Sequence, residues 1–412
     1  MLECQTVGYG GEALKFQYWL CGKTCVFVSV VYIAVAAAPP FALAQSEPAN
    51  DAPVLNDQPL QRPADGSSLT GRIYSEVRTD WVFNTDPLPP NVQPFSFNSE
   101  GAFDLRDTTT KIQLELQYYL TDRLTISTVA PYQIVRPTVD DRTFDDLGLF
   151  AEELYATYAG DVLDAKAGKF TLNFGQGYRD GATDLLFGND FSEAAAELTE
   201  HIGFEVGASL NNRYLGDYRL SVSTYYLDDT FLSNSLFVER GEIDRIDGGL
   251  ANTGGFDSFG LAFTGKSPFG IGPLNYHAAY VHRAAGITET ANENAFTGSL
   301  WATIPIHGID TKGFVEYVGY WDADGVADRK RDLLTLGLRF EKNGWFGAGE
   351  WNMRKTRDGQ FGTLDDYLVG VSAGYSFENG LQALAGYSHL RESGQDSDRI
   401  GVQLINVLPI SY

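Results

Sequence analysis

The sequence predicts an all-β protein, a transmembrane antiparallel β-barrel of about sixteen strands with short periplasmic turns and long external loops. Three observations predict this fold. Apolar and polar residues alternate with period two over most of the chain, and each alternating segment is near the length that a tilted strand needs to cross a bilayer. Short and long connections also alternate between these segments.

Residues 1–44 have the features of a secretory signal peptide. A basic flank that includes Lys23 precedes an apolar stretch, and Ala42-Leu43-Ala44 forms a small-residue cleavage site before Gln45. We expect cleavage after Ala44, so that the mature chain begins at Gln45. An uncleaved anchor helix is the alternative, and the long segment before Lys23 leaves open a translation start downstream of Met1.

Cysteine usage and the next segment define the mature chain. All three cysteines, Cys4, Cys21 and Cys25, fall within the expected signal peptide, so the mature chain would hold neither a disulfide framework nor a lipid-accepting cysteine. Residues 45–68 are rich in proline and polar residues and lack apolar periodicity. We expect a disordered periplasmic leader there, before an outer-membrane barrel of residues 69–412.

The composition excludes several classes of protein. The chain carries 54 Asp and Glu against 30 Lys and Arg, a formal net charge of −24. This acidity argues against nucleic-acid binding, because phosphates require clusters of Lys and Arg. After Ala44 no uninterrupted apolar run is long enough for a membrane helix, so a membrane-spanning chain would have to cross with strands.

Alternation places the two faces of each expected strand. In the first strand Ile73, Val77 and Trp81 share one face, and Arg72, Glu76 and Arg78 share the other. The pattern persists to the end of the chain. The expected strands are residues 72–83, 111–120, 124–133, 150–158, 164–174, 202–210, 218–227, 256–265, 274–283, 296–306, 312–321, 332–341, 345–354, 367–377, 381–390 and 399–412.

Connection lengths give an independent test of the barrel. Residues 121–123, 159–163, 342–344 and 378–380 are short connections, and the last two contain Asn-Gly, the strongest hairpin dipeptide. Residues 84–104, 175–201, 228–255 and 284–294 are long, polar or glycine-rich connections. Strict alternation of this kind is typical of outer-membrane barrels, which have short periplasmic turns and long external loops.

The polar face carries too many charges for a dry protein core, since each unpaired buried charge costs several kcal/mol or more. A water-filled interior removes that cost, so we interpret this face as a lumen. Its alternative is the solvated face of a soluble antiparallel sheet. We assign to the lumen wall Glu76, Glu115, Glu153, Lys169, Arg283, Arg339 and Arg354.

Two short motifs carry a family resemblance. Residues 118–127, Tyr-Tyr-Leu-Thr-Asp-Arg-Leu-Thr-Ile-Ser, resemble a strand, periplasmic turn and strand of outer-membrane porins, and Gly168-Lys169-Phe170 through Phe174-Gly175 resembles the strand before their third external loop. This second motif, followed by residues 184–200, is also similar to siderophore-associated porins. The resemblance covers the architecture of residues 69–412.

The resemblance implies a porin of the Gram-negative outer membrane, a water-filled channel for passive diffusion of small hydrophilic solutes without a cofactor. The implied partners are those solutes, the lipids and lipopolysaccharide of the outer membrane, and the barrel-assembly machinery, which would recognise the C-terminal strand. Whether the chain forms a homo-oligomer is left open. Alternatives are a substrate-specific uptake barrel of the siderophore type and a non-conducting structural or adhesin barrel.

In porins the third external loop folds into the lumen, and the corresponding segment is residues 175–201. We assign to a pore constriction the loop carboxylates and the wall cations that would oppose them: Asp184, Asp190, Glu193, Glu197, Arg72, Arg78 and Lys111. The excess of acids predicts a modest cation preference. Capping-box spacing from Asp190 predicts a short helix in this loop. An ordinary solvated surface loop is the alternative.

Motifs for chemistry are weaker. A lipid hydrolase would need a serine and a histidine together, and only Ser388 with His389 or Ser223 with His282 are candidates, neither with an orienting partner, so we expect no enzyme. The histidines lack zinc spacing, and we expect no metal site. Paired aspartates at 140–141 and 145–146 could instead hold divalent cations that bridge lipopolysaccharide, and residues 322–325 resemble part of a calcium loop or a plain Asp-Gly turn.

Overall fold

A computed structural model describes residue 66 and residues 68–83, 105–136, 141–177, 191, 196–359 and 362–412. The expected signal peptide and nearly all of the expected leader lie outside these residues. Among the described residues, no helix has both the length and the apolar character required to cross a membrane.

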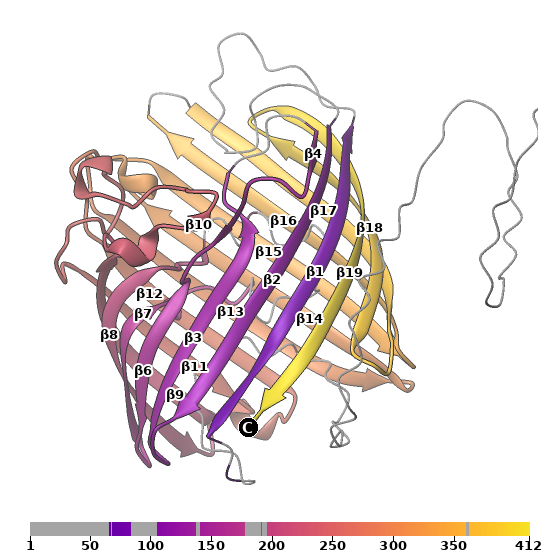
Figure 1. Ribbon diagram of the computed structural model, residues 1–412, viewed down its shortest axis with the longest axis horizontal. Helices are drawn as coiled ribbons and strands as arrows, with labels where there is room; N and C mark the ends of the chain where they lie inside the picture. Colours follow the sequence, from indigo (N-terminus) through magenta and orange to yellow (C-terminus); the bar gives the residue numbers. More distant parts are fainter. Residues whose placement is uncertain are drawn as a thin grey trace, which may run out of the picture. The chain divides into compact units, whose positions relative to one another are not determined.

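The described chain forms a closed antiparallel barrel of 16 strands, which confirms the predicted fold class (Figure 1). Each long strand pairs with its neighbour in the chain, and the first and last strands, indigo and yellow in Figure 1, lie side by side and close the sheet. The long strands are β1 (Leu69–Phe83), β2 (Leu105–Tyr119), β3 (Leu124–Ile134), β6 (Glu153–Ala159), β7 (Leu163–Phe170), β8 (His201–Asn212), β9 (Gly216–Leu227), β11 (Ser258–Lys266), β12 (Leu274–Arg283), β13 (Glu293–Ile306), β14 (Ile309–Trp321), β15 (Lys330–Lys342), β16 (Trp345–Asp358), β17 (Gly362–Ser376), β18 (Leu381–Glu392) and β19 (Gln395–Ser411).

Closure at the β1–β19 seam is continuous. The register runs without a break from Thr70 opposite Ser411 to Phe83 opposite Asp398. The backbone N–H groups of Ser68 and Leu69 both donate to the Tyr412 carbonyl, at 2.9 and 3.1 Å. A closed sheet has no free edge, so every strand finds hydrogen-bond partners on both sides, as an apolar solvent demands.

All of the expected strands correspond to long strands of the barrel, but several of them extend further along the chain than expected. β2 begins at Leu105 rather than 111, and β16 runs to Asp358 rather than 354. Apart from Leu105, the missed residues are polar or charged on both faces, so alternation is not visible in them. Three short strands were not expected: β4 (Arg142–Thr143), β5 (Leu147–Leu149) and β10 (Leu236–Phe237). They lie in long connections, and β5 pairs with both β3 and β10.

The prediction that short and long connections alternate strictly along the chain was wrong. One end of the barrel has short turns throughout, such as the two residues between β13 and β14, and the other end carries the long connections. At this long-loop end, however, β18 and β19 are joined by Ser393 and Gly394 alone. The Ser393 N–H donates to the buried carboxylate of Asp366 at 2.8 Å, which allows a tight turn here in place of a loop.

The two faces of the sheet differ as predicted. Outward positions are apolar and exposed, for example Val77, Phe204, Val222 and Leu338 at 41%, 52%, 57% and 43%. Inward positions are polar and often buried. Glu115, Glu205, Arg219, Glu316, Arg339 and Glu350 are each at most 7% exposed. This division matches a wall with hydrocarbon outside and polar groups inside.

Candidate functional site

Six of the seven residues assigned to the lumen wall lie on the inward face of their strands, where most of them meet groups of opposite charge, whereas Lys169 stands in the outward alternation of β7, opposite Leu154 and Ile202. Glu115 accepts both Nε and Nη2 of Arg72 at 2.8 Å. Glu76 accepts the Tyr74 hydroxyl at 2.6 Å, and Glu153 accepts the Thr171 N–H at 2.9 Å. The wall cations are held in the same way. Arg283 pairs with Glu293, Arg339 with Glu341, and Arg354 with Asp366 and Glu392.

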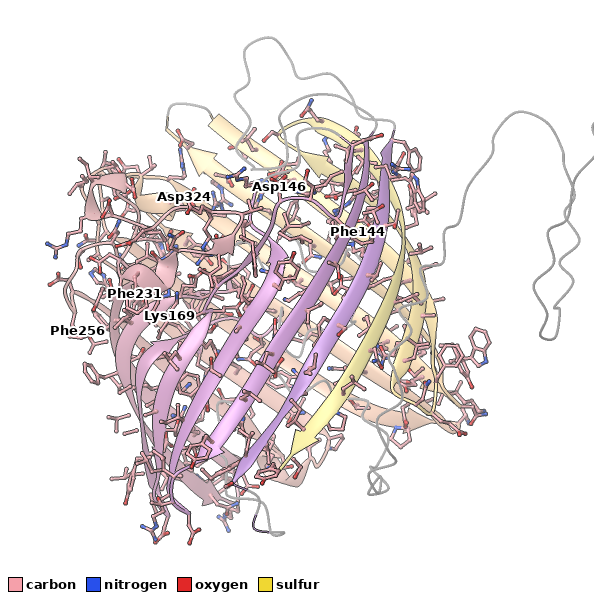
Figure 2. All side chains as sticks on the ribbon, in the orientation of Figure 1. Phe144, Asp146, Lys169, Phe231, Phe256 and Asp324 are labelled. Carbon is pink, nitrogen blue, oxygen red and sulfur yellow. The ribbon has the colours of Figure 1, made fainter. Side chains whose placement is uncertain are left out.

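Lys169 ties the start of the connection between β7 and β8 to its end. Figure 2 labels this residue on its strand. Its side chain is 1% exposed, and Nζ lies 2.8 Å from Glu200 Oε2 and 2.7 Å from Asp228 Oδ2. Arg240 from the next long connection also pairs with Glu200. Gly168 permits this arrangement, because its φ is +134° and a Cβ there would stand 2.4 Å from the Leu154 carbonyl oxygen.

The connection between β7 and β8, residues 171–200, returns on itself as two adjoining limbs. Leu172 N–H donates to the Leu198 carbonyl at 3.0 Å, and Gly175 N–H donates to the Ala196 carbonyl at 3.3 Å. A Cβ on Gly175 would lie 2.5 Å from the Ala196 Cβ, so only glycine allows the limbs to approach this closely. We call residues 171–177 the outgoing limb.

The outgoing limb lies against the inner face of the barrel wall. Asn173 Nδ2 donates to Thr264 Oγ1 on β11 at 3.3 Å, and the Phe174 carbonyl lies 2.7 Å from His277 Nε2 on β12. The Phe174 ring packs edge-on against Tyr320 of β14, with centroids 6.3 Å apart. The limb therefore follows the wall from strand to strand.

Glu316 of β14 anchors the end of the outgoing limb. Its carboxylate accepts the N–H of Gln176 at 2.6 Å and that of Gly177 at 3.1 Å. The Ser299 hydroxyl donates to the same carboxylate at 2.7 Å, and Glu316 is 1% exposed. A buried carboxylate that accepts two backbone N–H groups makes strong, charge-assisted hydrogen bonds.

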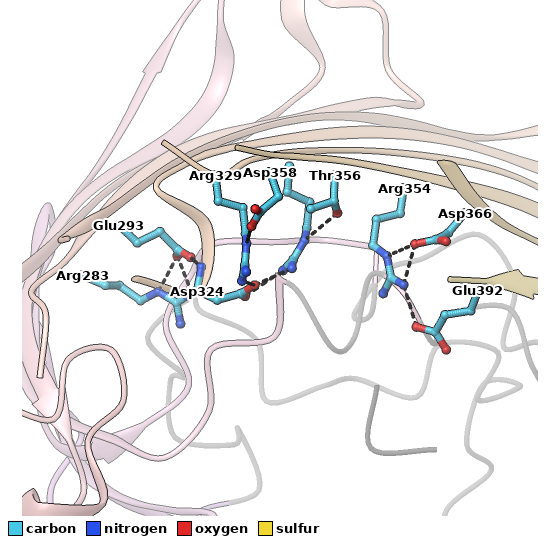
Figure 3. A network of polar contacts seen from close by, with 10 residues as sticks. Arg283, Glu293, Asp324, Arg329, Arg354, Thr356, Asp358, Asp366 and Glu392 are labelled. Carbon is cyan, nitrogen blue, oxygen red and sulfur yellow. Dashed lines mark hydrogen bonds and ion pairs between the residues drawn. The ribbon is translucent and has the colours of Figure 1, made fainter. Parts of the chain in front are cut away.

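A second anchor lies two strands further round the wall. The guanidinium of Arg354 on β16 stands 4.3 Å from the centroid of the Phe191 ring, a cation–π contact. Asp366 and Glu392 hold this guanidinium from the other side at 2.8 and 2.6 Å (Figure 3). Phe191 and Ala196 have helical backbone, while residues 192–195 of the expected helix lie outside the described residues.

The connection thus covers one part of the inner wall. Its residues Leu172, Phe174, Phe191, Ala196 and Leu198 belong to a buried apolar cluster. The wall residues of that cluster include Tyr225, Ala262, Ala279, Val281, Ala295, Val318, Tyr320, Leu333 and Leu368, which come from β9, from β11 to β15 and from β17. The facing part of the wall is less covered: the inward residues of β1 from Arg72 to Asp80 are half-buried, whereas those of β13 from Glu293 to Ser299 are buried.

The residues assigned to the constriction divide into three groups. Asp184, Asp190 and Glu193 lie outside the described residues. Glu197 is described and half-buried, at the start of the returning limb. The wall cations lie on β1 and β2, away from the anchored side, and acidic residues accompany them: Arg72 pairs with Glu115, Arg78 with Asp80 at 2.6 Å, and Lys111 lies opposite Glu76 in the register.

Sequence reasoning missed the anchoring roles and these acidic neighbours. Alternation placed Glu316 on the inward face, but nothing in the sequence links it to Gln176, because the contact joins residues 140 positions apart. Arg78 and Asp80 belong to the same inward row of β1, so alternation could have paired them, whereas the pairing of Arg72 with Glu115 depends on the β1–β2 register, which alternation alone does not fix.

A row of ion pairs lines the inner wall at the long-loop end. Figure 3 shows Arg283, Arg329 and Arg354 projecting to the same side of the wall, each against a carboxylate. In this row Asp324 accepts Arg331 and Arg329. Burial opposes ionisation of Asp324, but Arg331 and then Arg329 outweigh it and lower the pKa of this carboxyl below its ordinary value.

The weaker motifs of the sequence have ordinary structural roles. Ser388 is buried on the inward face, whereas its neighbour His389 belongs to the outward face, and Ser223 and His282 are likewise on opposite faces. Neither pair can meet. Asp141 accepts the Arg106 N–H, and Asp322 caps the turn through the Asp328 N–H. Within the described residues no three His, Cys, Asp or Glu side chains are grouped as metal ligands require.

Comparison with solved structures identifies the fold as that of outer-membrane porins. OprB of Pseudomonas putida matches with a TM-score of 0.57 at 9% identity, over 83% of this chain and 94% of that chain. The outer-membrane channel DcaP of Acinetobacter baumannii matches with 0.54 at 13% identity (82% and 96%), and OmpF of Salmonella typhi with 0.54 at 11% (85% and 100%). No model of a known protein family matches the sequence, and no curated protein matches it. At these identities the likeness establishes the fold, and the chain has a porin-like β-barrel.

Proposed function

We propose that this protein is an outer-membrane porin, a water-filled channel for passive diffusion of small hydrophilic solutes. The observation that carries the proposal is the connection between β7 and β8, whose described residues are fastened to one side of the inner wall by Glu316 and Arg354. A loop held inside a barrel narrows its lumen and leaves a path along the opposite wall. This path would run beside β1 and β2.

The charges on β1 and β2 support a wetted path there. Arg72, Arg78 and Lys111 are ionic side chains on the inward face that the apolar cluster does not cover. Keeping them dry would cost several kcal/mol for each ion that lacks full compensation. Water along this wall removes that cost, and the porin-like fold of known outer-membrane channels agrees with it.

We further propose a modest preference for cations. The acids beside Arg72, Arg78 and Lys111 offset much of their field, so the carboxylates of Asp184, Asp190, Glu193 and Glu197 would dominate at the constriction. Fixed charges at a narrow point act at short range with little screening, whereas exposed loop charges are screened within roughly 8 Å at physiological salt.

Reversal potential in a planar bilayer under a salt gradient tests both proposals. Wild type is expected to conduct and to favour cations, and replacing Asp184, Asp190, Glu193 and Glu197 by Asn or Gln is expected to reduce that preference. A matched control removes four exposed acids of other connections: Asp145, Glu239, Glu242 and Asp257. An equal effect of the two variants would refute the constriction, and absence of conductance in verified folded barrels would refute the channel.

The same proposal includes orientation and processing. We place the long-loop end outside the cell, the short turns in the periplasm and the mature N-terminus at Gln45, because outer-membrane barrels expose their long loops. The mature chain would then contain no cysteine. A cysteine introduced at Thr288 should react with an impermeant maleimide on intact cells, and one at Asn343 should react only after lysis. The reverse labelling would overturn the orientation.

A further inference from the structure

Lys169 stands in the outward row of β7, among apolar neighbours. The residues before it in that row are apolar, and Leu154 of β6 and Ile202 of β8 lie opposite it in the register. A lysine that faced lipid at this point would destabilise the barrel. Its side chain is only 1% exposed, so another part of the chain covers it on the outer side of the wall.

The cover is the first part of the connection between β9 and β11, residues 228–243, which we call the strap. The Leu232 carbonyl accepts Lys169 Nζ at 2.9 Å. Further along the strap, β10 pairs with β5. The ring of Phe237 packs edge-on against Tyr132, which belongs to the outward row of β3, with centroids 5.8 Å apart. The strap therefore runs from the end of β9 to the wall beside β3.

Glu200 joins the strap to the connection inside the barrel. It ends the returning limb, residues 196–200, and β8 begins at the next residue, His201. Arg240 of the strap donates to both oxygens of the Glu200 carboxylate, through Nη1 at 2.8 Å and through Nη2. Lys169 donates to the same carboxylate from the wall at 2.8 Å. A bidentate pair of this kind fixes the orientation of the carboxylate as well as its distance.

Arg240 is fixed in turn within the strap. Its Nε donates to the Ser233 carbonyl at 2.7 Å, and its backbone N–H donates to the Ser235 hydroxyl at 2.9 Å. Its guanidinium lies 3.9 Å from the centroid of the Phe150 ring. Ser233 and Ser235 are buried, so the strap is packed around this side chain. A movement of the strap would therefore move Arg240 and pull on Glu200.

The contacts continue from Glu200 into the lumen. The returning limb accepts two backbone N–H groups of the outgoing limb, and Glu316 anchors that limb to the wall. On its other side the strap is accessible, since Phe231, Leu236 and Phe237 are 77%, 65% and 77% exposed. One unbroken series of contacts thus links an accessible segment at the long-loop end with the connection inside the barrel.

We propose that the strap is a latch for this inner connection. When the strap leaves the outer side of the wall, Arg240 releases Glu200, and both limbs inside the barrel become loose. A change at the long-loop end would then alter the current without any contact in the lumen. This inference rests on the proposed channel, because it gives the loop that narrows the lumen a second holding point.

Amide hydrogen exchange of folded barrels tests the latch independently of conductance. Arg240→Gln removes the bidentate pair and is expected to accelerate exchange of the Leu172 and Gly175 amides about 10-fold, as the loss of a hydrogen bond between charged groups does. Arg245→Gln is the matched control, since Arg245 belongs to the same connection but lies 3.9 Å from Asp229. It should exchange like wild type, and equal exchange in the two variants would overturn the latch.

A reversible tether tests whether the strap acts on the pore. Leu149 and Leu236 lie directly opposite each other in β5 and β10, a relation that suits a disulfide, and all three cysteines of the chain precede Gln45. In Leu149→Cys, Leu236→Cys, oxidation should hold the strap in place and lower the open-state current noise, and reduction should restore it. Adding Glu200→Gln should abolish this difference, because the tethered strap no longer holds the inner connection.

Two results would overturn the coupling to the pore. One is a current that does not depend on the tether, and the other is an undiminished difference between oxidised and reduced barrels when Glu200 is replaced. Failure of the proposed function gives a different result. The expected exchange pattern in barrels that do not conduct would refute the channel and leave the latch standing.

Discussion

Replacing Glu316 by Gln should loosen the outgoing limb without disturbing the barrel. The carboxylate accepts two backbone N–H groups, from Gln176 and Gly177, whereas the isosteric amide has one oxygen and presents an NH₂ donor in place of the other. One buried N–H then faces a donor. Leaving a buried polar group unsatisfied costs about 1–3 kcal/mol.

This cost destabilises only the state in which the outgoing limb is bound to Glu316, here called the docked state. A loss of about 1–3 kcal/mol raises the population of the undocked limb by about 5-fold to 150-fold. In single-channel recordings we expect open-state current noise to increase and the mean conductance to rise, because the loop no longer holds one position. Ser299→Ala removes one hydrogen bond that orients Glu316 and should give a smaller effect of the same sign.

Glu350→Gln is the matched control. Glu350 is 4% exposed on the inward face of β16 and accepts Asn352 Nδ2 of its own strand at 2.7 Å. It is therefore a buried carboxylate of the same wall, two strands away from Glu316. If Glu316→Gln and Glu350→Gln barrels, both verified as folded, show the same conductance and noise as wild type, the limb does not depend on Glu316 and the reasoning is wrong.

Two further predictions concern acid and closure. The lowered pKa of Asp324 means that its ion pairs stabilise the connection of residues 322–329 above the ordinary value of 3.8 and that this contribution is lost as pH falls through the lower folded value. Hydrogen exchange of the connection should therefore accelerate below pH 3.8, and Asp324→Asn should show fast exchange at neutral pH with no such step. The seam between β1 and β19 predicts that the barrel resists detergent until boiled and then changes its mobility on a gel, so an unshifted band from membrane-inserted protein would count against closure.

Strands were predictable from the sequence because their signal is local. An apolar residue such as Leu338 must face hydrocarbon and its neighbour Arg339 the interior, so the period of two is imposed along the strand itself. The same rule was sufficient to exclude Ser388 with His389 as a reacting pair, because successive residues of a strand point to opposite faces. That pair should not have been a candidate.

Anchors of the inner loop were not predictable in this way. The bonds from Gln176 to Glu316 and the contact of Phe191 with Arg354 join segments that meet only after the barrel has closed. A single sequence holds no local mark of such contacts, since Glu316 has the same alternation as any inward carboxylate. The fold could thus be derived from pattern, while the site depends on tertiary contacts that a pattern does not encode.

The charged runs that hid the ends of β15 and β16 explain how one segment serves two surfaces. Residues 354–358, Arg-Lys-Thr-Arg-Asp, show no alternation of apolar and polar residues, yet the pleat still sends successive side chains to opposite faces. Arg354 and Asp358 point inward, to Phe191 and to Arg329, whereas Lys355 and Arg357 belong to the outward row. Position within the pleat therefore decides the effect of a substitution more than charge does. Arg354→Gln should disturb the inner loop and conductance, and Arg357→Gln, three residues away, should act on the lipid-facing surface alone.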